Sequence, residues 1–176
     1  MEGGQAIPTI TPDAQGVQLD TRYLLALLLG RDWERDVFDS VHALVTPPAR
    51  ARVEVSLVTV GEAFTKIATD QLAPRHDDRT PWARWLRVVQ EGKLTVCWGD
   101  HHSHNSDLLE VARQVKARVP HVGPADCLIV ACALTCSHCS TLHTTDRTLL
   151  TSPGLRRFCS SDGRSLRLAE APTRPR

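Results

Sequence analysis

The sequence lacks any apolar run of about 18 residues, which is the length that a membrane-spanning helix needs. It also lacks a basic amino-terminal stretch followed by an apolar core, so its beginning does not resemble a signal peptide. Lysine is scarce, since most of the 21 basic residues are arginines, and the formal net charge is only +1. The chain therefore has no overall attraction for nucleic acid, and any basic surface must be local. We expect a cytoplasmic protein.

The composition is that of one soluble globular domain. Hydrophobic residues make up 41% of the 176 residues and charged residues 23%, and no internal repeat is present. We expect a flexible leader over residues 1–16, a single domain over 17–170 and a short tail over 171–176. In a cytoplasmic protein the six cysteines are reduced thiols or metal ligands rather than disulfides.

Short strand-like and longer helix-like segments alternate along the chain. Residues 53–58 place Val53, Val55 and Leu57 against Glu54 and Ser56, the period-two pattern of a strand. The alternation predicts an α/β fold with a central, mostly parallel sheet covered on both faces. The other predicted strands are 17–19, 94–98 (ending at Trp98), 142–144 and 165–170 (after an Asp162-Gly163 turn). The predicted helices are 21–29 (with Gly30 as C-cap), 32–45, 59–71, 81–91, 107–118 and 127–136, followed by a short helix after residue 146.

Four acidic residues stand at the junctions between these elements. Asp20 and Asp146 follow short strands, and Glu62 and Asp126 lie near the starts of predicted helices. In a parallel sheet all four can meet outside the carboxyl ends of the strands. Four carboxylates there would repel one another, and a hard cation such as Mg²⁺ or Mn²⁺ would relieve the repulsion.

Each of the four acids also has a purely structural interpretation. Asp20 is placed to cap the helix that begins at Thr21, and Asp146 to cap the turn after it. Glu62 fits the third position of a capping box whose N-cap is Thr59. Asp126 falls in a first helical turn, where a negative charge is favourable.

Four segments resemble the signature segments of PIN-domain nucleases, and they occur in the same order: LDTRYLLALL, VSLVTVGEAF, GPADCLIVACAL and LHTTDRTLL. The resemblance covers residues 17 to about 150. It implies a Rossmann-like three-layer sandwich and Mg²⁺- or Mn²⁺-dependent hydrolysis of phosphodiester bonds, usually in RNA. Many members of this family are VapC-like toxins that a small antitoxin neutralises, and members commonly form homodimers.

The resemblance assigns roles to particular residues. The acidic quartet (Asp20, Glu62, Asp126 and Asp146) matches the family's catalytic metal ligands, and Thr144 matches a supporting hydroxyl position. At position 22 the chain departs from the family, because many members have asparagine where this sequence has Arg22. Arg22 and Arg147 are candidate phosphate contacts, and simple solvation is the alternative for both.

The expected function is therefore an endoribonuclease, the toxin of a toxin–antitoxin pair. One alternative is an RNA-processing or DNA-directed PIN nuclease without an antitoxin. The other is a catalytically inactive PIN scaffold that binds RNA or protein. Because the quartet is intact in the sequence, the inactive scaffold is the less favoured of these alternatives.

Three further groups have weaker signals. A zinc site is one interpretation of the cysteine and histidine spacing near residue 136, and buried thiols are the favoured one. The histidines of the polar loop are expected to be solvated. Two tryptophans are expected to pack in the core or at a subunit interface, with base stacking as the alternative. The zinc candidates are Cys132, Cys136, His138, Cys139 and His143. The loop histidines are His101, His102 and His104, and the two tryptophans are Trp82 and Trp85.

Overall fold

The structure is a computed structural model that describes residues 16–46, 52–69, 79–97, 105–161 and 164–171. The described residues form a sheet of five strands, and every neighbouring pair is parallel. The order across the sheet is β3-β2-β1-β4-β5. The strands are β1 (Gly16–Leu19), β2 (Val53–Ser56), β3 (Thr95–Cys97), β4 (Cys139–His143) and β5 (Arg167–Ala169).

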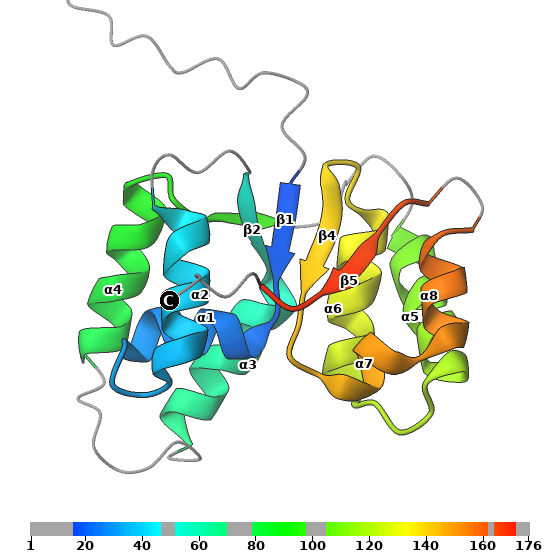
Figure 1. Cartoon of the computed structure of the whole chain (residues 1–176), viewed down its shortest axis with the longest axis horizontal. Helices are drawn as coiled ribbons and strands as arrows, with labels where there is room; N and C mark the ends of the chain where they lie inside the picture. Colours follow the sequence, from blue (N-terminus) through cyan, green and yellow to red (C-terminus); the bar gives the residue numbers. More distant parts are fainter. Residues whose placement is uncertain (1–15, 47–51, 70–78, 98–104, 162–163, 172–176) are drawn as a thin grey trace, which may run out of the picture.

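Helices cover both faces of this sheet, as Figure 1 shows. Helices α1, α2 and α4 lie on one side, and α5, α6, α7 and α8 lie on the other, while α3 contacts both α1 and α6. The predicted three-layer α/β fold is therefore confirmed. The helices are α1 (Thr21–Leu29), α2 (Arg35–Val45), α3 (Leu57–Ala68), α4 (Arg79–Gln90), α5 (Asn105–Arg118), α6 (Pro124–Thr135), α7 (Arg147–Thr151) and α8 (Pro153–Cys159).

Helix α1 forms and ends where the sequence predicts. Its residues favour helix, and all of them except Arg22 are buried. Gly30 ends the helix with a φ of 92°, a conformation that residues with a Cβ rarely adopt. Gly30 also leaves room for Arg84, whose Nη1 donates a 2.9 Å hydrogen bond to the carbonyl of Leu28. The end of α1 is thus fastened to α4.

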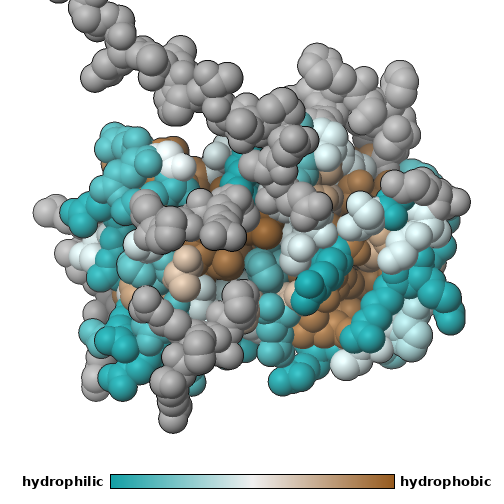
Figure 2. All heavy atoms as spheres, turned by 45° about the horizontal axis from the view of Figure 1, so that its top comes forward, coloured by the Kyte–Doolittle hydropathy of each residue, from teal (hydrophilic) through white to brown (hydrophobic). Residues whose placement is uncertain are grey.

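Two hydrophobic cores lie on the two faces of the sheet. One joins the leucines of α1 to Val53 and Val55 of β2, and the other joins α5, α6 and α8 to Leu142 of β4. Figure 2 shows hydrophilic side chains over the flanks and hydrophobic side chains toward the middle. Within the described residues, every helix is too short or too polar to cross a membrane.

The prediction for the segment from β2 into α3 was wrong at the boundary between the two elements. Strand β2 ends at Ser56, and Ser56 rather than Thr59 is the N-cap, because its Oγ accepts a 3.0 Å hydrogen bond from the Thr59 amide. Glu62 therefore lies in the second turn of α3. Glu54 and Ser56 are buried under α6, as the predicted cover on both faces of the sheet requires.

Other boundaries differ by a few residues. Helix α2 begins at Arg35, later than predicted, and β4 runs over Cys139–His143 rather than 142–144. Gly16, assigned to the leader, belongs to β1, and Ala171, assigned to the tail, donates its amide to the Tyr23 hydroxyl at 2.8 Å. The rest of the leader and tail, Trp98, the histidine loop and the Asp162-Gly163 turn lie outside the described residues.

Candidate metal centre

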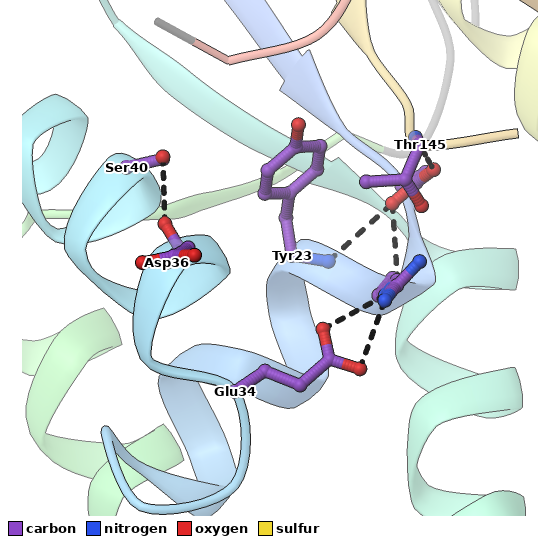
Figure 3. A network of polar contacts seen from close by, with 7 residues as sticks. Tyr23, Glu34, Asp36, Ser40 and Thr145 are labelled. Carbon is purple, nitrogen blue, oxygen red and sulfur yellow. Dashed lines mark hydrogen bonds and ion pairs between the residues drawn. The ribbon is translucent and has the colours of Figure 1, made fainter. Parts of the chain in front are cut away.

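Asp20 lies where β1 ends and α1 begins. Its amide donates a 3.0 Å hydrogen bond to the carbonyl of His143, which fixes the end of β1 against the end of β4. Its Oδ1 accepts from the amides of Arg22 (3.1 Å) and Tyr23 (3.4 Å), so the predicted capping role is confirmed. Its Oδ2 accepts a 3.1 Å bond from the amide of Thr145, beyond β4. Figure 3 shows Thr145 beside the start of α1.

Burial raises the pKa of the Asp20 carboxyl above its usual value. Hydrogen bonds from the Thr144 hydroxyl and from the amides of Thr145, Tyr23 and Arg22 oppose this shift, because they stabilise the charged form. Asp20 is thus a carboxylate whose charge is costly in the folded protein. Its position is fixed by hydrogen bonds on both oxygens.

Thr144 links Asp20 to Asp146. Thr144 is fully buried, its hydroxyl hydrogen-bonds the Asp20 carboxyl, and its Oγ1 accepts a 3.0 Å bond from the Asp146 amide. Asp146 Oδ1 accepts from the amides of Thr148 (2.6 Å) and Leu149 (3.2 Å) and so caps α7. The supporting position predicted for Thr144 therefore has a concrete geometry, with one hydroxyl between two acids.

Glu62 has two partners that the sequence did not reveal. Thr21 Oγ1 donates a 2.6 Å hydrogen bond to Glu62 Oε2. Lys66, one turn further along α3, places its Nζ 2.7 Å from Glu62 Oε1. The only advance signal for either contact was the four-residue spacing of Glu62 and Lys66 on a predicted helix.

Asp126 lies in the first turn of α6, after Pro124 at the start of the helix. Burial raises the pKa of Asp126 most, and the negative charges of Glu62, Asp146 and Asp20 raise it further, whereas Lys66 lowers it. Asp126 is therefore within electrostatic reach of the other three acids. The four side chains come from the starts of α1, α6 and α7 and from the second turn of α3.

The acids are nevertheless spaced more widely than the ligands of a single ion. Among the described residues, one group of three potential ligand atoms from His, Cys, Asp or Glu lies within 4.8 Å of one another, and it belongs to Glu54, Cys97 and Cys136. This spacing suits a hydrated ion, since Mg²⁺ commonly keeps several waters and binds one or two carboxylates directly. A hard divalent cation fits the donor set, because all four side chains offer carboxylate oxygens and repel one another without it.

The two arginines predicted as phosphate contacts are both in ion pairs. Arg22 forms a bidentate pair with Glu34, at 2.8 Å from Nε to Oε2 and 3.0 Å from Nη2 to Oε1 (Figure 3). Arg147 Nη2 lies 3.4 Å from Glu170 Oε1, and its side chain is 82% exposed. The looser contact leaves Arg147 the freer of the two to bind another anion.

The cysteine and histidine cluster considered for zinc does not assemble as a unit. His138 is exposed, and His143 lies at the other end of β4, where its ring meets that of Tyr23 edge to face. Cys132 and Cys136 are buried, in line with the favoured interpretation. The sulfur of Cys136 instead approaches Glu54 and Cys97.

Comparison with known proteins shows similarity of fold only. No protein-family model matches the chain, and no curated protein matches it significantly. Among solved structures, the chain is similar to one in the crystal structure of VapBC2 from Rickettsia felis bound to a DNA fragment from their promoter. The TM-score is 0.54 at 10% sequence identity, over 86% of this chain and 97% of that chain. The two chains share a fold. At this identity the likeness does not extend to activity.

Proposed function

We propose that this protein is a Mg²⁺- or Mn²⁺-dependent endoribonuclease of the PIN type, with the acidic quartet holding the ion. The observation that carries the proposal is the placement of the four acids near the starts of α1, α3, α6 and α7. Burial raises the pKa of Asp126 most, and the charges of the other three acids raise it further. The acids lie at the edge of the sheet that holds the carboxyl ends of the parallel strands, where α/β folds bind their ligands. The shared fold with a chain of the VapBC2 structure supports the same assignment.

A divalent ion held there would supply Lewis acidity for the hydrolysis of a phosphodiester bond. Asp20 and Asp146 are fixed by their helix-capping hydrogen bonds and would present their remaining lone pairs to the ion or its waters. Glu62 is held by Thr21 and Lys66. Asp126, whose pKa is raised by burial and then by the charges of the other three acids, is our candidate for accepting a proton from water.

We further propose that the substrate phosphate contacts Arg147 in preference to Arg22. Arg22 is engaged on two nitrogens by Glu34, whereas Arg147 has one long contact and is largely exposed. Releasing Arg22 would leave the half-buried Glu34 unpaired, and that makes Arg22 a structural residue first.

A small antitoxin is the proposed protein partner. The similar chain in the VapBC2 structure motivates this proposal. Helix α4 of this protein also exposes a row of apolar side chains, Trp82 (53% exposed), Leu86 (41%) and Val89 (37%), with spacings that place them on one helical face. Such a row is suited to burial against a partner or a second copy of the chain. Trp82 and Trp85 both meet the Phe64 ring edge to face, at 5.4 Å and 6.0 Å between ring centroids, and Trp85 is the one that packs against the core.

The test is cleavage of a mixed RNA pool and of single-stranded DNA by metal-free protein to which Mn²⁺ is restored. We expect Mn²⁺-dependent cleavage of RNA that is abolished in Asp126→Asn and retained in Asp39→Asn. Asp39→Asn is a matched control, because it removes the same charge from a residue of α2 that forms a surface ion pair with Arg31. Cleavage that survives in Asp126→Asn would refute the proposed site, and cleavage of DNA alone would favour the DNA-directed alternative.

One observation favours a second candidate, the inactive scaffold. Both oxygens of Asp20 already accept hydrogen bonds, and the quartet is too widely spaced to surround one ion directly. A scaffold of this kind would bind RNA or a partner protein in the absence of Mn²⁺ and would cleave none of the pool. Filter binding with and without Mn²⁺ on the same pool separates the two candidates.

A further inference from the structure

We propose that Glu54, Cys97 and Cys136 form a second metal site. Its two cysteines suit an ion that prefers thiolate ligands, such as Zn²⁺. The carboxylate oxygen and the two sulfurs lie within 4.8 Å of one another in the described part of the chain. The site is separate from the acidic quartet, and the inference does not depend on the proposed nuclease activity.

The distances suit a tetrahedral zinc site. Cys136 Sγ lies 3.4 Å from Glu54 Oε2. Metal–sulfur and metal–oxygen bonds of about 2.3 Å and 2.0 Å at tetrahedral angles require a sulfur–oxygen separation of about 3.5 Å. Two of the three ligands are therefore already at bonding separation from a common metal position. Three protein ligands leave the fourth position for water or a small anion.

The fold brings the three residues together from distant segments. Glu54 lies in β2, and Cys97 of β3 pairs with Ser56, two residues further along β2. Because side chains alternate along a strand, Glu54 and Cys97 point to the same face of the sheet. Cys136 is the C-cap of α6, the helix that covers this face.

The charges would balance when a divalent ion binds. Glu54 is 1% exposed. Arg52 Nε lies 2.5 Å from Glu54 Oε1 and forms an ion pair whose angles do not meet those of a hydrogen bond. Oε2 accepts a hydrogen bond from the Cys136 thiol, and loss of that thiol proton on metal binding would free this oxygen as a ligand. Two thiolates and one carboxylate carry three negative charges, which one divalent cation and one guanidinium neutralise.

A buried polar neighbour also marks this face as unusual. Gln18 of β1 pairs in register with Glu54, so its side chain points the same way. Gln18 is fully buried, and neither polar atom of its side chain has a hydrogen-bond partner among the described residues. Buried polar groups without partners are uncommon in native proteins, and they occur where a ligand or water completes the structure.

The two proposed centres are at opposite ends of α6. Asp126 lies in its first turn and Cys136 just after its last residue, about 15 Å apart along the helix axis at 1.5 Å per residue. They also differ in chemistry, since one offers oxygen only and the other offers mainly sulfur. Metal binding at the second site breaks two S–H bonds, forms two metal–sulfur bonds and releases two protons to solvent.

The test is titration of reduced, metal-free, untagged full-length protein with Co²⁺, followed by the thiolate-to-cobalt charge-transfer absorption. We expect a band that saturates at one equivalent, is removed by an equivalent of Zn²⁺, and disappears in Cys97→Ser and Cys136→Ser. Cys159→Ser is the matched control, because Cys159 is a buried thiol at the end of α8, in the other core cluster, and its replacement should leave the band unchanged. The band should also survive in Asp126→Asn, which separates this site from the acidic quartet.

Two outcomes would overturn the inference. One is a folded, reduced wild-type protein that shows no thiolate band, a result that does not depend on whether any variant folds. The other is a band that persists in both cysteine variants, which would place the metal at other thiols. Mass spectrometry of unreduced protein adds a direct alternative, because a Cys97–Cys136 disulfide together with no Co²⁺ binding after reduction would identify a redox pair instead.

Discussion

Thr21 Oγ1 donates a 2.6 Å hydrogen bond to Glu62 Oε2, joining the first residue of α1 to the second turn of α3 across 41 positions of sequence. Thr21 directly follows Asp20, so the bond sets the position of one acid relative to another. Thr21 is 5% exposed, which shields this bond from water. Thr21 is therefore a positioning residue for the proposed metal centre.

Replacing Thr21 with valine keeps the shape of the side chain and removes the donor. We expect Mn²⁺ affinity to fall about tenfold, as is typical when a residue that orients a metal ligand is lost. Calorimetry on the metal-free protein measures the effect. Thr65→Val, an exposed change on α3, the helix that carries Glu62, is the control and should leave the affinity unchanged. Equal Mn²⁺ affinities in wild type and Thr21→Val would show that Thr21 does not position the metal ligands.

Asp126→Asn should stabilise the metal-free protein at neutral pH. The folded-state pKa of Asp126 is raised, so folding disfavours its charged form, and stability falls as pH rises through that pKa. The gain should be largest at neutral pH, where the wild-type carboxyl is charged in the folded protein. It should vanish below the ordinary value of 3.8, where both states are protonated. Urea unfolding in chelator across pH tests this, and a neutral-pH loss of stability would contradict it.

His143 should make the protein less stable in mild acid. Burial lowers the pKa of His143 below its ordinary value of 6.5, so the unfolded chain takes up a proton more readily than the folded one. The contribution of His143 to the free energy of unfolding is therefore fully present above pH 6.5. It is lost as the pH falls from there toward the lower folded-state pKa. The slope approaches about 1.4 kcal/mol per pH unit for one proton.

The measurement is the difference in unfolding free energy between wild type and His143→Leu from pH 8 to 5. Taking the difference cancels the opposing contributions of the raised carboxyl pKa values of Asp20 and Asp126. The variant should gain relative to wild type as the pH falls. A difference that is flat across this range would show that His143 titrates alike in both states.

Ser56→Ala should destabilise the protein by about 1 kcal/mol, the usual cost of losing an N-cap side chain. Ser56 is fully buried, its Oγ caps the Thr59 amide, and it also lies 2.8 Å from the Thr59 hydroxyl. Thermal or urea unfolding measures the loss. Ser160→Ala, an exposed change, is the reference and should stay within about 0.5 kcal/mol. Matching losses in the two variants would argue against Ser56 as the cap.

The sequence predicted the features that depend on local pattern. Asp20 before an apolar run and Gly30 after it marked both ends of α1, and the alternation of strands and helices marked the parallel sheet. It misplaced the start of α3 because the apolar alternation continued past Ser56 into Leu57, which belongs to the helix.

The partners of the candidate sites were beyond the sequence because they depend on tertiary contacts. Nothing local to Glu62 points to Thr21, and nothing local to Cys136 points to Cys97 or Glu54. The zinc spacing near Cys136 drew attention to His138 and His143, but β4 carries those two residues apart. The four acids themselves could be singled out, because each stands at the end of a strand or near the start of a helix.

The central claim is that the acidic quartet binds a hard divalent ion. The most direct test is calorimetric titration of metal-free, untagged protein with Mn²⁺, beside the double variant Asp20→Asn/Asp126→Asn. We predict saturable binding in the wild type and its loss in a variant that remains folded by circular dichroism. Binding of the same strength in the folded variant would contradict the claim and place the ion elsewhere in the protein.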